Sequence, residues 1–139
     1  MDPTVSSFSG TSFSGTASAV VLSVFLMAVG VAHFAAPGCF RSLVPSWLGR
    51  AGPLVAASGV AEIVIGLLVL APGSRAAGAW AAAGLITGYP VCHLDALRQT
   101  RRGHPQLLLR PLGVAARLVV NLGYIGWAVA IAVAARGGS

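Results

Sequence analysis

A single acidic residue lies in the middle of an apolar stretch of this sequence. Glu62 is surrounded by Val, Ala, Ile, Leu and Gly over residues 53–71. In a hydrocarbon environment a charged side chain costs about 2.5–3.5 kcal/mol on insertion scales, unless it is paired or neutralised. Glu62 therefore predicts a polar contact inside a helical bundle, and a carboxyl group that can exchange a proton.

The counter-charge that the sequence offers to Glu62 is Arg117, on another apolar stretch, with Asn121 one turn along the same helix face. At a rise of about 1.5 Å per residue, Glu62 and Asn121 have similar depths from one end of the bundle. Tyr89 and Arg117 lie nearer that end, and His33 nearer still. Four stretches thus contribute polar side chains to one leaflet. We expect a Glu62–Arg117 ion pair, on which the predicted pocket depends.

This polar cluster has two interpretations. In the structural one, the Glu62–Arg117 pair fixes the packing of the helices. His33 then bonds a backbone carbonyl, and Tyr89 belongs to an interfacial aromatic belt. In the functional one, the cluster lines a cavity that opens to the cytoplasmic leaflet, where it binds or reacts with a small amphipathic molecule.

Other reactive side chains are weaker candidates. His93 and Asp95 end an apolar stretch and His104 lies in the loop after it, so we interpret all three as interfacial. No two histidines share a helix face, and we predict no metal or haem site. Cys39 and Cys92 form no CxxC pair and are interpreted as small apolar fillers.

Four apolar segments must position these groups, at residues 17–36, 53–71, 75–94 and 112–135. Each is about 19 to 24 residues long, enough to cross about 30 Å of hydrocarbon as a helix. We therefore predict an all-α integral membrane protein. Residues 17–136 form its transmembrane four-helix bundle, and residues 1–16 a flexible polar tail.

Composition also favours a membrane protein. Of 139 residues, 56% are hydrophobic and 9% charged, against about 25% charged in soluble domains. The net charge of +6 comes from nine arginines, but no basic stripe alternates with aromatic residues, so we predict no nucleic-acid partner. The use of Arg without Lys, together with abundant Ala and Gly, is typical of a GC-rich bacterial genome.

The arginines also predict an orientation. Loops 37–52 and 95–111 hold six of them, whereas the opposite side has only Arg75 and Arg136. The positive-inside rule places both loops in the cytoplasm and both termini outside the inner (plasma) membrane. The aromatic and proline-containing loop around Trp47 is expected to lie in the interface or fold back toward the bundle.

Small residues predict where helices approach closely. Gly84 and Gly88 form a GxxxG pair on the third segment, and Gly59 and Gly66 lie two turns apart on the second. Such positions let backbones come together where lipid supplies no hydrophobic drive. They serve either the internal bundle or contact with a second copy.

Short runs in all four segments also carry a family resemblance. They are GVAHF at residues 30–34 with VPSWL at 44–48, SGVAEI at 58–63, YP at 89–90, and RL at 117–118 with Asn121 and Trp127. Over residues 28–130 the chain resembles the DoxX-like family of small membrane proteins, although Asn121 stands where that family usually has Gln. Relatives in that family include subunits of a thiosulfate:quinone oxidoreductase and a membrane partner of superoxide dismutase and a sulfurtransferase.

The resemblance implies a membrane subunit that holds a quinone-like or other amphipathic molecule and supports a redox partner protein, alone or as a homo-oligomer. With no cofactor motif of its own, the chain should not carry electrons by itself. Glu62 and His33 would be the acid–base groups. The substrate-binding residues would be Arg117, Asn121, Tyr89, Trp47 and Trp127.

Two other functions remain open. One is a membrane enzyme (an isomerase, cyclase or hydrolase) that acts on a lipid-soluble metabolite through acid–base chemistry of Glu62 and His33. The other is an assembly or scaffold protein whose polar cluster is purely structural. A dry bundle with a tight Glu62–Arg117 pair and no lumen would favour the scaffold.

Overall fold

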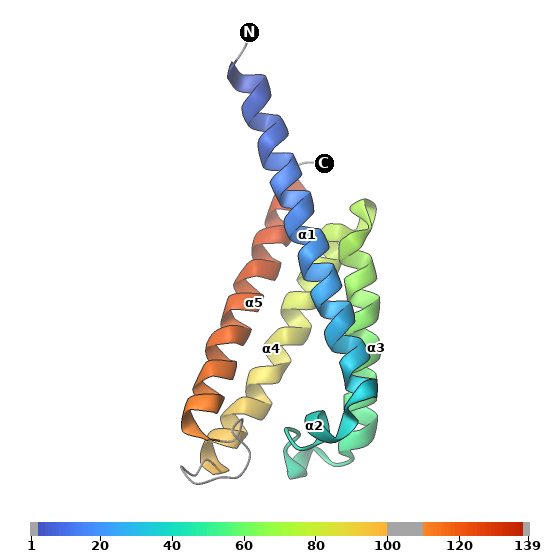
Figure 1. The fold of residues 1–139 in the computed structure, drawn as a ribbon, viewed down its shortest axis with the longest axis vertical. Helices are drawn as coiled ribbons and strands as arrows, with labels where there is room; N and C mark the ends of the chain where they lie inside the picture. Colours follow the sequence, from blue (N-terminus) through green and yellow to red (C-terminus); the bar gives the residue numbers. More distant parts are fainter. Residues whose placement is uncertain (1–2, 100–109, 138–139) are drawn as a thin grey trace.

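The computed structural model describes residues 3–99 and 110–137, with side chains at residues 15–95 and 110–137, and these residues form helices joined by short turns. Four long helices run alternately in opposite directions (Figure 1). They are α1 (Pro3–Ala35), α3 (Ala51–Leu70), α4 (Arg75–Gln99) and α5 (Pro111–Gly137). The short α2 (Pro37–Arg41) and the 3₁₀ turn η1 (Ser46–Leu48) connect α1 to α3, and the 3₁₀ turn η2 (Pro72–Ser74) connects α3 to α4.

The predicted all-α class is confirmed for the described residues, and three of the helices are long and apolar enough to cross a membrane. These are Gly15–Ala35, Ala51–Leu70 and Pro111–Gly137, of 21, 20 and 27 residues. The observed bounds of α3 and α5 lie within two residues of the predicted segments 53–71 and 112–135. The segment predicted at 75–94 is also helical, but Trp80, Tyr89 and His93 lower its hydropathy.

The N-terminal residues differ from the prediction. The segment 1–16 was expected as a flexible polar tail, whereas helix α1 already begins at Pro3. Once the apolar part of α1 has formed, each further residue adds one backbone hydrogen bond without a new nucleation step. Proline is also well suited to the first turn of a helix, where its missing N–H is not needed.

Helices α1 and α3 cross with their backbones in direct contact. A Cβ atom added to Gly59 would lie 2.9 Å from the carbonyl oxygen of Gly30, and one added to Gly66 would lie 3.0 Å from that of Ser23. The Ser23 hydroxyl donates a hydrogen bond of 2.6 Å to the Gly66 carbonyl across the crossing. The prediction that Gly59 and Gly66 allow a close helix approach is therefore confirmed.

The GxxxG pair on α4 has a different environment. A Cβ atom at Gly84 or at Gly88 would meet no atom within 4 Å. Within the described part of the chain these two glycines therefore bring no helices together, so of the two roles left open for them the internal contact is not seen, and contact with a second copy stays a prediction.

The apolar core lies in the half of the molecule nearer the chain termini. Its residues come from the middle of α1, the end of α3, the first half of α4 and the last part of α5: Ala19, Leu22, Leu26, Val69, Ala79, Ala82, Ala83, Ile86, Ala128, Ile131 and Ala132. Helix α5 packs mainly on α4, and α3 packs on both α1 and α4. The half nearer the 36–50 connection is where the polar groups gather.

Candidate functional site

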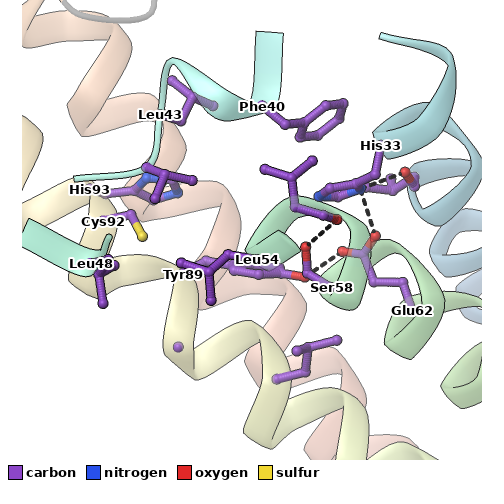
Figure 2. A pocket seen from close by; sticks show the side chains of 15 residues that line it. His33, Phe40, Leu43, Leu48, Leu54, Ser58, Glu62, Tyr89, Cys92 and His93 are labelled. Carbon is purple, nitrogen blue, oxygen red and sulfur yellow. Dashed lines mark hydrogen bonds and ion pairs between the residues drawn. The ribbon is translucent and has the colours of Figure 1, made fainter. Parts of the chain in front are cut away.

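A cavity of about 370 Å³ lies between α1, α3, α4 and the 36–50 connection (Figure 2). Its size falls in the range of small-molecule pockets. Most of its wall is apolar, formed by Val29, Phe40, Leu43, Val44, Leu48, Leu54, Val55, Leu85 and Gly88. The remaining lining residues carry polar or titratable groups: His33, Ser58, Glu62, Tyr89, Cys92 and His93.

Glu62 is the centre of the first polar group in the cavity. Its side chain is 2% exposed, and the Tyr89 hydroxyl donates a hydrogen bond of 2.6 Å to Glu62 Oε1. His33 Nδ1 lies 3.1 Å from Glu62 Oε2. Helix α3 and the two helices that pack on it, α1 and α4, thus supply one acid, one imidazole and one phenol to a single site (Figure 2).

The hydrogen-bond directions around His33 indicate where protons lie. His33 Nδ1 also lies 2.8 Å from the carbonyl oxygen of Val29. Both neighbours of Nδ1 are acceptors, so this nitrogen carries a proton, which points to the Val29 carbonyl. Glu62 Oε2 consequently accepts no hydrogen bond from any described residue. It is a buried carboxyl oxygen, free to accept a hydrogen bond or to carry a proton at the cavity wall.

The predicted ion pair between Glu62 and Arg117 is wrong. The three guanidinium nitrogens of Arg117 have no hydrogen-bond partner among the described residues, and Glu62 is paired with His33 instead. The reason is the order of the helices, since α4 lies between α3 and α5 and the latter two barely touch. The cavity nevertheless forms, so its predicted dependence on that pair is also wrong.

A second polar group lies between α4 and α5. The Asn121 amide donates to the Arg117 carbonyl at 2.7 Å and lies 3.0 Å from His93 Nε2. His93 is only 8% exposed and lines the cavity, apart from Glu62 and His33 (Figure 2). The His93 side chain therefore lies between helices, and its interpretation as a residue at interfacial depth stays a prediction.

The structure separates the other predicted site residues. Of the seven, His33, Glu62 and Tyr89 line the cavity, whereas Arg117, Asn121, Trp47 and Trp127 do not. Trp47 is 63% exposed, and its indole donates to Asp95 at 3.2 Å. Trp127 donates to the hydroxyl of Ser18 at 2.6 Å, beside the apolar core. His104 lies outside the described residues.

Three lining residues were missed as site residues from the sequence: Ser58, Cys92 and His93. A signal for His93 was present, because it follows Tyr89 by four residues and so shares its helix face. Cys39 and Cys92 are both free, the former exposed and the latter half-buried. Among residues with described side chains, no group of three His, Cys, Asp or Glu could hold a metal ion.

Residues 22–132 match the model of a family described as a domain of unknown function, DUF8561. The chain belongs to this family. No curated protein and no solved structure matches it. The DUF8561 region includes both polar groups and the whole lining of the cavity, from Val29 to Asn121.

Proposed function

We propose that this DUF8561 protein is a DoxX-like, four-span subunit of the bacterial inner membrane. It binds a quinone-like or other amphipathic small molecule in the cavity between α1, α3 and α4, and supports a redox partner protein. The observation that carries the proposal is the free Oε2 of Glu62, a buried carboxyl oxygen at the wall of an otherwise apolar cavity.

The connectivity supports α4 as the fourth span. Helices α3 and α5 are both candidate spans, and α3 ends near the chain termini whereas α5 begins at the opposite end (Figure 1). A chain that leaves the membrane on one side after α3 and re-enters from the other side before α5 must cross in between. Helix α4, of 25 residues, runs that distance, and about 20 residues are enough.

The same arrangement supports the orientation. The start of α1 and the end of α5 lie at one end of the molecule, and the end of α1, the end of α4 and the start of α5 lie at the other (Figure 1). The sequence segments 37–52 and 95–111, which follow α1 and include the end of α4 and the start of α5, hold six arginines. We place this basic end in the cytoplasm, so the cavity lies in the cytoplasmic leaflet and the termini outside.

The proposed chemistry is proton exchange with a bound carbonyl or hydroxyl group. When Glu62 is protonated, Oε2 donates a hydrogen bond to a ligand carbonyl, and when it is ionised, Oε2 accepts one from a ligand hydroxyl. The phenol of Tyr89 holds Oε1, and the protonated Nδ1 of His33 lies 3.1 Å from Oε2, the oxygen that would exchange the proton with the ligand. Electrons would come from the partner protein, which is how a chain without a redox cofactor takes part in such a reaction.

A quinone-binding experiment tests this function. Decylubiquinone is titrated into the purified protein in a nonionic detergent, and binding is followed by quenching of tryptophan fluorescence. We expect saturable binding that Glu62→Gln weakens about tenfold, since a hydrogen bond to a charged group contributes about 1.5–3 kcal/mol. The matched control is Asp95→Asn, the same change at an acid outside the cavity lining. Equal affinity of the Glu62→Gln protein and the wild type would remove the proposed role.

The short distance between His33 and Glu62 favours a second candidate, an acid–base enzyme. At 3.1 Å the two groups can pass a proton between two positions of a lipid-soluble substrate, as an isomerase, cyclase or hydrolase requires. Turnover by the purified chain without any partner protein would decide for this candidate. The scaffold has less support, because its expected Glu62–Arg117 pair is absent and the cavity is present.

A further inference from the structure

The polar group between α4 and α5 has donors without acceptors. All three guanidinium nitrogens of Arg117 are buried and lack a hydrogen-bond partner among the described residues. The guanidinium carries five N–H donors and a fixed positive charge. A buried polar group is normally satisfied, so a fully unpaired guanidinium indicates a missing acceptor.

His93 adds a second buried nitrogen without a hydrogen-bond partner in the described structure. The Asn121 amide lies 2.7 Å from the Arg117 carbonyl, which only an N–H can approach favourably, so its nitrogen faces that group. The same nitrogen lies 3.0 Å from His93 Nε2, which must therefore be the acceptor. The proton of the neutral ring is then on Nδ1, and Nδ1 is buried without a partner in the described structure.

The chain cannot supply the missing counter-charge. It contains three acids, Asp2, Glu62 and Asp95. Glu62 is engaged by His33 and Tyr89, and Asp95 accepts from Trp47 without reaching the guanidinium. Asp2 lies outside the described residues and precedes α1, whose first turn is at the opposite end of the molecule from the start of α5. Residues 100–109 contain no acid, so no carboxylate of the described chain pairs with Arg117, and a charged acceptor would come from another molecule.

These donors adjoin the cavity. His93 and Cys92 line it, and the Asn121 amide bridges His93 and the Arg117 carbonyl, at 3.0 Å and 2.7 Å. An anion at Arg117 and His93 would therefore have the apolar wall of Leu43, Leu48 and Leu85 beside it. Phosphate and carboxylate groups are the acceptors that match a guanidinium.

We infer that Arg117 and His93 form an anion-binding site for the acidic headgroup of an amphiphile whose apolar part occupies the cavity. The inference rests on the proposed function, because it takes the cavity as a ligand site and adds the charge of the ligand. The shared chemistry is a phosphate or carboxylate on an apolar chain, which either a bilayer lipid or a lipid-soluble metabolite provides. Glu62, at the other side of the cavity, would then face a different part of the same molecule.

The test compares dodecyl phosphate with dodecanol, two ligands that share a chain and differ in charge. Each is titrated into delipidated protein in a nonionic detergent, and binding is followed by the midpoint of thermal unfolding and by native mass spectrometry. We expect dodecyl phosphate to bind about tenfold to hundredfold more tightly, as a charged hydrogen bond predicts. Arg117→Gln should abolish this difference, and His93→Phe should reduce it.

The matched control is Arg136→Gln, at the other end of the same helix, where Arg136 lies over the Trp80 ring at 5.5 Å. This variant should keep the full preference for dodecyl phosphate. Equal binding of the two ligands by the wild type, or a preference that survives Arg117→Gln, overturns the anion site while leaving the cavity as a ligand site. Binding of neither ligand overturns the proposed function as well.

Two further arms identify the source of the anion. Inorganic phosphate that binds as tightly as dodecyl phosphate, with the same dependence on Arg117, overturns the amphiphile and leaves a free anion. In nanodiscs, phosphatidylglycerol that competes with dodecyl phosphate supports a bilayer lipid as the ligand. Dodecyl phosphate binding that is unchanged by phosphatidylglycerol supports a lipid-soluble metabolite.

Discussion

Where α1 crosses α3, the backbones touch at Gly30 and Gly59, and the hydroxyl of Ser23 finds an acceptor on the opposite helix. Where α4 runs beside α5, Gly84, Gly88, Gly123 and Gly126 all face open space. There the charged group of Arg117 stays unpaired. The buried Ser23 hydroxyl is therefore hydrogen-bonded across its helix pair, whereas the buried Arg117 guanidinium has no partner across its own.

We interpret the α1–α3 pair as a packing contact and the α4–α5 pair as part of the proposed ligand site. Close backbone contact holds α1 and α3 in one register and fixes the position of His33 against Glu62. Glu62 thus has partners on both neighbouring helices, His33 and Tyr89. Between α4 and α5 the unmatched donors raise the free energy of the empty protein, because buried charge without a partner is unfavourable. An anion bound at the proposed site would remove that cost.

The largest change in the free energy of unfolding is expected from a larger side chain at the α1–α3 crossing. In Gly59→Val the new Cβ would lie 2.9 Å from both the Gly30 carbonyl oxygen and His33 Cβ. Since backbone cannot move aside as a flexible side chain can, we expect a loss of about 3 kcal/mol, the upper end for overpacking. The measurement is unfolding in mixed detergent micelles containing increasing amounts of dodecyl sulfate.

The control for this variant is Gly84→Val on α4, where an added Cβ meets nothing within 4 Å. It should change the free energy of unfolding by less than about 1 kcal/mol, in keeping with surface substitutions. Equal losses for the two valine variants would show that the close crossing of α1 and α3 is not what stabilises this half of the molecule.

The next largest effect is a gain in the free energy of unfolding when Arg117 is replaced. In delipidated protein, Arg117→Met should raise the free energy of unfolding by about 2 kcal/mol, because an apolar side chain replaces an unpaired buried charge. The same unfolding titration measures it, with Arg136→Met as the control at the far end of α5. A loss of stability in Arg117→Met would mean that the guanidinium already has a partner within the protein.

Several features of the fold were predictable from particular residues in the sequence. The helix bounds followed from prolines and apolar lengths, because a helix needs a run of suitable residues and an end signal, both local properties. The close approach at Gly59 and Gly66 was predictable for the same reason. Glu62 was recognisable as a site residue since its cost in hydrocarbon depends only on its position in the run.

The partner of Glu62 was not predictable in that way. Depth along the helix places Glu62, Arg117, Tyr89 and His33 in the same half of the membrane, but depth says nothing about which helices are neighbours. Helix order around the bundle decided that His33 and Tyr89 reach the carboxylate while α4 separates it from Arg117. Likewise, the 36–50 connection that closes the cavity contains no periodic pattern from which its fold could be read.

The smallest effect that distinguishes the two helix pairs is the loss of the Ser23 hydrogen bond. Ser23 is fully buried, and its hydroxyl donates to the Gly66 carbonyl at 2.6 Å, whereas Thr87 on α4 donates only to its own helix, at the Ala83 carbonyl. We expect Ser23→Ala to lower the free energy of unfolding by about 0.6 kcal/mol, the average for hydrogen bonds between membrane helices. Thr87→Val, measured in the same titration, should cost less, because its hydroxyl joins no second helix. If both variants were neutral, the α1–α3 crossing would be held by its glycine contacts alone, and the Gly59→Val variant would then account for the whole difference in stability between the two pairs.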